Sequence, residues 1–232
     1  MQDISKYQKF AEDILGFKFD EPQHLITALT HRSYMNEHKS SATAHNERLE
    51  FLGDAVLELV VTEFLYLNYD EPEGILTNWR AALVRTESIS AAGSRLGLYD
   101  LMRLSRGEKH GSDRAKQQIM ANAFEAVIGA IYLDKGYKAA SAFVHKHILA
   151  TLEDILQTGS WRDPKSRLQE VAQSVDGETP VYKVLAEDGP DHDKMFTLGA
   201  YIGNKLRGKG SGPSKQMAQQ EAAKNALKSY EK

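Results

Sequence analysis

Apolar residues recur with the period of an α-helix through most of the first 158 residues. Between positions 49 and 60 they fall at i, i+3, i+7, i+10 and i+11, which predicts the buried face of one helix: Leu49, Leu52, Val56, Leu59 and Val60. A second set predicts another buried helix face over 120–137: Phe124, Val127, Ile128 and Ile131. Gly129 interrupts this second helix with a residue that costs about 1 kcal/mol relative to alanine, so we expect close packing there.

Further helices are expected over 76–93 and 139–156, and the basic, glycine-containing segment 105–116 is expected to be a loop. The pattern then changes. Glycine, serine and proline interrupt it around 157–164, and beyond them alternating residues predict strands over 180–186, 195–202 and 205–210. Helices over 164–175 and 214–230 flank these strands. We therefore expect an all-α domain over 1–158, a linker over 159–163, and an α-β-β-β-α domain over 164–232.

The first buried helix also carries an acidic stripe. Glu47, Glu50 and Asp54 lie at i, i+3 and i+7, which places the three carboxylates on one face. A hard divalent cation such as Mg²⁺ would relieve their mutual repulsion, because it prefers carboxylate oxygens. A solvated acidic helix face explains the same spacing equally well. On the second helix, Asn122 and Glu125 share a face at i and i+3.

Composition narrows the class of protein. The chain has no cysteine, which fits a reducing cytoplasm, and we expect neither a signal peptide nor a membrane span. The net charge is −3, but from residue 160 onward there are 12 Lys and Arg against 10 Asp and Glu, and before it 17 against 22. A second domain with a net charge of +2 (12 minus 10) is not strongly basic, so the charge distribution by itself does not indicate nucleic-acid binding. The glycine-rich stretch 203–210 lacks the Ser or Thr of a P-loop, so no nucleotide cofactor is expected.

Two segments carry a resemblance to a known family. The string NERLEFLGD at 46–54 resembles the signature of the ribonuclease III family, the double-stranded-RNA endonucleases. The string GKGSGPSKQMAQQEAA at 208–223, within the α-β-β-β-α order, resembles the double-stranded-RNA-binding domain. The resemblance implies an all-α ribonuclease III endonuclease domain followed by an α+β RNA-binding domain. It also implies cleavage of duplex RNA to 5′-phosphate and 3′-hydroxyl ends, in the processing of ribosomal, messenger and other structured RNA.

The resemblance also assigns residues to the nuclease site. The family's metal ligands correspond to Glu50, Asp54, Asn122 and Glu125, with Asp54 and Glu125 as the catalytic pair and Mg²⁺ as the ion, for which Mn²⁺ can substitute. Glu47 and Glu73 match two supporting acids. The commonest residue at position 122 is Asp, and Asn removes one unit of charge, so we expect weaker metal binding. Phe51 corresponds to a side chain that inserts into the partner of a homodimer; a core position is the alternative.

The second domain supplies the expected grip on RNA. A duplex-RNA reader of this kind spans two minor grooves over about 16 bp. Its first helix and a loop should reach these grooves through Gln169, Glu170 and His192. The last helix should offer its N-terminus to phosphate, with Ser214 as cap and with Lys215, Gln216 and Gln219 on its surface. A rival interpretation is a non-catalytic, dimeric duplex-RNA-binding protein. Its only support is Asn122 and the small number of Lys and Arg residues at the start of the last helix.

Overall fold

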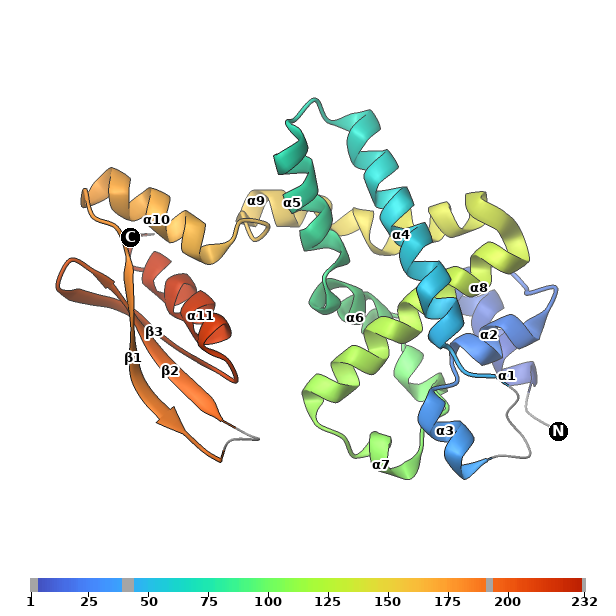
Figure 1. Cartoon of the computed structure of the whole chain (residues 1–232). Coiled ribbons are helices and arrows are strands. Elements are labelled where there is room, and N and C mark those ends of the chain that lie inside the picture. The colour runs from blue at the N-terminus through green and yellow to red at the C-terminus, as the bar shows by residue number, and fades with distance from the viewer. Residues whose placement is uncertain (1–3, 39–43, 191–193, 231–232) are drawn as a thin grey trace. The chain divides into compact units, whose positions relative to one another are not determined.

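A computed structural model describes residues 4–38, 44–190 and 194–230. The chain divides into two compact units, Met1–Thr158 and Gly159–Lys232. The first unit is helical and the second is an α+β sandwich (Figure 1), which confirms the predicted fold class. In the part of the chain that the structure describes, no helix combines the length and apolar character needed to cross a bilayer.

The first unit is built around two long helices. Its elements are α1 (Ile4–Phe10), η1 (Ala11–Leu15), α2 (Pro22–Ala28), α3 (Arg32–Glu37), α4 (Glu47–Asn68), α5 (Glu73–Val84), α6 (Thr86–Arg95), η2 (Leu98–Leu101), α7 (Arg106–Lys109), α8 (Asp113–His147), η3 (Leu149–Thr151) and α9 (Leu152–Thr158). Figure 1 shows α4 crossing α8, and this crossing holds much of the unit's core together.

Three expectations about these helices are wrong. The single helix expected over 76–93 is two, α5 and α6, because Arg85 adopts an extended backbone between them (φ −67°, ψ 151°). The expected loop over 105–116 contains α7 and the start of α8, whose first N–H groups are capped by Ser105 and Ser112. The helix expected over 139–156 is the end of α8 beyond a break at Gly136 (φ 78°), followed by η3 and α9.

The buried face of α4 is also rotated from its predicted position. Leu49, Val56 and Val60 are buried as expected, but Leu59 is 57% exposed. Leu57 and Val61 are fully buried in its place. The reason lies in tertiary packing, because α8 covers the side of α4 that carries Gly53, Leu57 and Val61.

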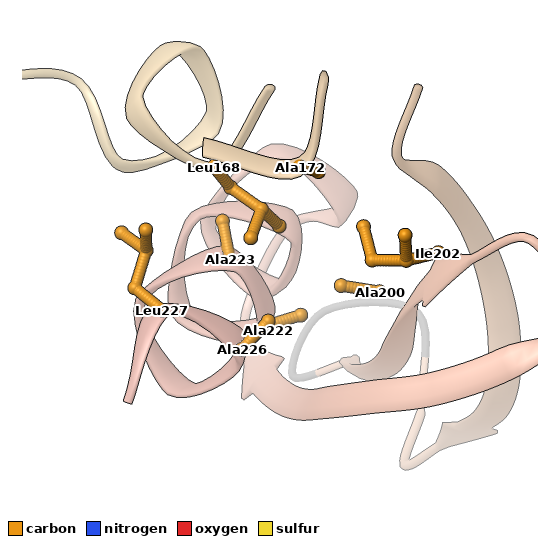
Figure 2. Packing of buried hydrophobic residues seen from close by; sticks show 8 residues of the cluster. All are labelled: Leu168, Ala172, Ala200, Ile202, Ala222, Ala223, Ala226 and Leu227. Carbon is orange, nitrogen blue, oxygen red and sulfur yellow. The ribbon is translucent and has the colours of Figure 1, made fainter. Parts of the chain in front are cut away.

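The second unit packs two helices against a small antiparallel sheet. Its elements are α10 (Pro164–Val175), β1 (Val181–Asp188), β2 (Met195–Ile202), β3 (Lys205–Gly212) and α11 (Lys215–Leu227), with strand order β1-β2-β3. Figure 2 shows apolar side chains of α10, β2 and α11 meeting in one cluster: Leu168, Ala172, Ala200, Ile202, Ala222, Ala223, Ala226 and Leu227. At Gly208 and Gly210, an added Cβ would lie 2.4 and 2.1 Å from the α11 backbone. Glycine at these positions therefore lets β3 lie directly against α11.

Candidate functional site

Two glycines bring the backbones of α4 and α8 into direct contact. A Cβ added at Gly53 would lie 1.7 Å from the carbonyl oxygen of Glu125, and one added at Gly129 would lie 2.3 Å from the carbonyl oxygen of Leu49. No side chain fits at such distances, so only glycine permits this approach. The close packing expected at Gly129 is confirmed, and its partner on α4 is Gly53.

This contact joins the two acidic helix faces. Glu50 and Asp54 flank Gly53 on α4, while Asn122 and Glu125 lie on the part of α8 that Gly53 touches. The carboxylates of Asp54 and Glu50 both act electrostatically on Glu125, and the Asn122 side chain lowers the pKa of Glu50. The structure therefore brings together four residues from two distant segments. We call Glu50, Asp54, Asn122 and Glu125 the acidic cluster.

The charges in the acidic cluster destabilise one another. Burial raises the pKa of Glu125 to about 8, and the nearby carboxylates of Asp54 and Glu50 contribute in the same direction. Burial also raises the pKa of Glu50, with further contributions from Glu47 and Asp54. A cation among these oxygens would offset both the free-energy cost of burying the carboxylates and their mutual repulsion.

Asn122 is the neutral member of the acidic cluster and is hydrogen-bonded to Gln118. Gln118, one turn earlier on α8, donates from Nε2 to Asn122 Oδ1 at 2.7 Å. The Asn122 side chain also lowers the pKa of the Glu50 carboxyl, against the larger, opposite effect of burial. Sequence reasoning missed Gln118, although its i, i+4 spacing from Asn122 was a usable signal.

The donors of the acidic cluster fit a hard divalent ion, since they are carboxylate and amide oxygens without sulfur or imidazole. In the conformation described, however, no group of three or more acidic or histidine side chains among the described residues is placed to hold an ion. Asp54 is exposed and Glu50 is only half-buried, so rotation of these side chains is sterically open. The match between the acidic cluster and a divalent ion therefore rests on the chemistry of its oxygen donors and on the repulsion among its carboxylates.

The two supporting acids lie in different places. Glu47 begins α4, lies 3.8 Å from Arg32, and acts electrostatically on Glu50. Glu73 begins α5, just after the other end of α4, and accepts a hydrogen bond from Thr77 at 2.9 Å. Because the 22-residue α4 is about 33 Å long, the single chain does not bring Glu73 to the acidic cluster.

Phe51 is on the surface of α4, with 81% of its area exposed. Leu59 and Tyr66, which are 57% and 77% exposed, lie on the same side of the helix as Phe51. Single exposed apolar residues are ordinary, but a row of large ones along one helix marks a surface suited to association. The alternative of a core position for Phe51 is wrong for this chain.

The RNA-binding residues expected on α11 are largely engaged within their own unit. Ser214 caps α11 by accepting from the Met217 N–H at 3.2 Å. The ammonium of Lys215 lies 3.0 Å from a carboxylate oxygen of Glu187 and over the ring of Phe196. Sequence reasoning missed Glu187, because it lies on β1, far from Lys215 along the chain.

The remaining residues expected to bind RNA differ in their surroundings. Gln219 accepts a hydrogen bond from Lys165 at 2.8 Å, whereas the side chain of Gln216 is exposed. On α10, Gln169 and Glu170 are both exposed. His192 lies outside the described residues.

Comparisons with known proteins cover both units. A family model described as Ribonuclease-III-like matches residues 21–152, and one described as Double-stranded RNA binding motif matches residues 164–230. The chain is 44% identical to Ribonuclease 3 of Desulforamulus reducens, over 94% of this chain and 89% of the relative. It is 42% identical to Ribonuclease 3 of Bdellovibrio bacteriovorus, over 97% of this chain and 96% of the relative.

Solved structures agree for the helical unit. The nuclease domain of ribonuclease III from Campylobacter jejuni is similar with a TM-score of 0.54 and 38% identity, over 60% of this chain and 96% of that one. A second structure of that domain gives a TM-score of 0.53 and 36% identity, over 64% and 95%. The work on the first structure concerned flexibility in a region involved in dimer formation.

Proposed function

The chain belongs to the ribonuclease III family and is a divalent-metal-dependent endoribonuclease for double-stranded RNA, and on that premise we propose that the acidic cluster is its cleavage site. The observation that carries this proposal is the Gly53–Gly129 contact, which joins acids of α4 to acids of α8. We propose Mg²⁺ as the ion, with Mn²⁺ able to replace it, because every donor in the cluster is a hard oxygen.

Within the cluster, Glu50, Asp54 and Glu125 would hold the ion, with the amide oxygen of Asn122 as a fourth, neutral donor. When bound, the divalent ion would supply an activated water and positive charge beside the phosphate oxygens. Asp54 and Glu125 are the catalytic residues of this proposal. The products we propose carry 5′-phosphate and 3′-hydroxyl ends, and the proposed substrates are ribosomal, messenger and other structured RNA precursors in the cytoplasm.

Two copies of the chain would provide two acidic clusters, one for each RNA strand. We propose a homodimer that pairs through the exposed face of α4 around Phe51, which its 81% exposure supports. Glu47, beside Glu50, would support the cluster of its own chain. Glu73 lies at the other end of α4, so we propose that it supports the cluster of the second copy.

The second unit would hold the duplex. The N-terminus of α11, capped by Ser214, presents free N–H groups suited to phosphate, and Lys215 and the Gln216 and Gln219 amides lie beside it. Gln169, Glu170 and His192 are the proposed minor-groove contacts. Because Glu187 already pairs with Lys215, phosphate must compete for this ammonium, and we expect the unit to bind RNA with modest affinity.

The test compares cleavage with binding. Wild-type protein and Asp54→Asn are incubated with a long RNA duplex and Mg²⁺, and duplex binding is measured separately by gel shift in chelator. Glu58→Gln is the matched control, because Glu58 is an acid of α4 that pairs with Arg80 rather than with the cluster. We expect Asp54→Asn to bind without cutting and the control to cut normally. Full cleavage by Asp54→Asn would contradict the site, and binding without cleavage by the wild type would support the non-catalytic rival.

A further inference from the structure

The side chain of Lys165 reaches from α10 to α11 without meeting an acid. Its Nζ donates a hydrogen bond to Oε1 of Gln219 at 2.8 Å and lies 5.3 Å from the centre of the Tyr182 ring. The nearest acid along the chain, Asp163, instead accepts a hydrogen bond from the Ser166 N–H at 2.9 Å. Among the described residues no carboxylate forms an ion pair with Lys165, so its positive charge is not neutralised there.

The cation that α11 itself carries near its N-terminus is in the opposite state. The first two turns of α11 contain one basic residue, Lys215, and its ammonium lies 3.0 Å from a carboxylate oxygen of Glu187. The neighbouring Gln216 and Gln219 carry no charge. Lys165 therefore brings to the surface of α11 an ammonium that no carboxylate already holds.

The hydrogen bond from Lys165 also fixes the amide of Gln219. A lysine ammonium only donates hydrogen bonds, so the carbonyl oxygen of Gln219 must face it and the amide nitrogen points away. The ammonium has three donors, of which Gln219 takes one. Both side chains are partly exposed. An anion beside them would therefore meet charged ammonium donors and the NH₂ group of Gln219 together.

We propose that Lys165 binds a phosphate of duplex RNA together with the NH₂ group of Gln219, and that it supplies positive charge that α11 lacks at Gln216 and Gln219. Gln169, the proposed minor-groove contact, lies four residues after Lys165 and so on the same side of α10. A duplex-RNA reader contacts two minor grooves and the phosphates between them, so a cation between Gln169 and α11 is placed for phosphate. The proposal rests on the proposed function, since it takes α10 and α11 as the RNA-binding surface.

The expected effect follows from counterion release. Each phosphate that a cation neutralises contributes about 0.9 to the slope of log affinity against log salt concentration. Removing one such contact should make the loss of affinity about 3.5-fold larger at 50 mM than at 200 mM salt. A purely structural role for Lys165, as a link between α10 and α11, predicts no change in this slope when the hydrogen bond to Gln219 is kept.

The experiment measures the affinity of the full-length protein for an RNA duplex longer than about 16 bp, in chelator, over a series of salt concentrations. Lys165→Gln removes the charge but keeps a donor for Gln219, whereas Lys165→Arg keeps the charge. Lys228→Gln is the matched control, because Lys228 Nζ also donates to an amide oxygen, Oδ1 of Asn225 at 2.9 Å, but at the other end of α11. We expect a slope smaller by about 1 for Lys165→Gln and a wild-type slope for Lys165→Arg and Lys228→Gln.

Each other outcome is decisive, provided that urea unfolding shows the variants to be folded. A wild-type slope for Lys165→Gln overturns the proposal, and so does an equal reduction in Lys165→Arg or in Lys228→Gln. The wild type distinguishes this failure from failure of the proposed function. If its own affinity for the duplex does not depend on salt, the second unit does not bind phosphate and both proposals fall. If its affinity depends on salt and Lys165→Gln keeps the same slope, only the role of Lys165 is refuted.

Discussion

Replacing Glu125 with glutamine should abolish cleavage and yet stabilise the ion-free protein at alkaline pH. The Glu125 carboxyl is half-buried against α4, near the carboxylates of Asp54 and Glu50. Its ionised form is therefore disfavoured in the folded chain. Glutamine has nearly the same shape but no charge, so it removes this penalty together with a metal ligand.

The size of the effect follows from the raised pKa. Burial, with the two neighbouring carboxylates, raises the pKa of Glu125 from 4.5 to about 8. At 1.36 kcal/mol per pH unit, this rise sets an upper limit of about 5 kcal/mol on the cost of ionising Glu125 in the folded protein. Solvent reaches part of the side chain and screens the charges, so we expect a gain of about 2–3 kcal/mol.

The sign depends on pH. Between pH 4.5 and about 8 the folded protein keeps the Glu125 proton while the unfolded chain has lost it. The folded state then binds more protons, and its stability falls as pH rises through this window. The cost is absent below pH 4.5 and complete above pH 8. Glu125→Gln should therefore match the wild type near pH 4.5 and exceed it increasingly toward pH 9.

The assay is urea unfolding in chelator at several pH values, paired with gel shift and cleavage of duplex RNA. Glu153→Gln, an acid on α9 in the same unit but outside the cluster, is the control. Added Mg²⁺ should stabilise the wild type more than Glu125→Gln. Equal stability of the two proteins at pH 9 in chelator would refute the electrostatic reasoning. Loss of duplex binding by the variant would refute the separation of cleavage from RNA binding.

Three further predictions concern the packing of α4 on α8, the dimer and RNA binding. Gly53→Ala should lower the free energy of unfolding by at least about 1–3 kcal/mol and impair cleavage, because its Cβ would lie 1.7 Å from a carbonyl oxygen of α8. Gly74→Ala is the control and should unfold like the wild type, because the space around its Cβ is open. Equal melting temperatures of the two variants would contradict this reasoning. Phe51→Glu should sediment as a monomer in ultracentrifugation, whereas the fragment 1–158 with Phe51 in place should sediment as a dimer. A monomeric fragment would refute the proposed dimer interface around Phe51. Lys215→Ala should weaken duplex binding equally for all RNA sequences and reduce the slope of log affinity against log salt concentration by about 1. Glu187→Gln should strengthen duplex binding, because it frees the Lys215 ammonium. A loss of affinity that depends on RNA sequence would exclude a phosphate contact for Lys215.

Local patterns in the sequence were enough to predict the fold class, and the resemblance to a known family predicted the enzymatic function. The 3.6-residue period of α4 and the alternation in β1 and β2 depend only on neighbours along the chain, so both are visible without a structure. The signature 46–54 is long enough to indicate the family. Gly129 indicated a close helix contact, because a glycine within a helix is costly unless packing requires it.

What the sequence left undecided was which surfaces meet. The period of α4 cannot say that α8 covers Leu57 and Val61 and leaves Leu59 in solvent, because that depends on where a distant helix crosses. Nor can spacing show that Glu187 of β1 pairs with Lys215 of α11, or that Gly53 of α4 meets the backbone of Glu125 on α8. Sequence patterns identify apolar and charged faces. The partner of each face is set by contacts between segments far apart in the chain, and only the tertiary structure contains them.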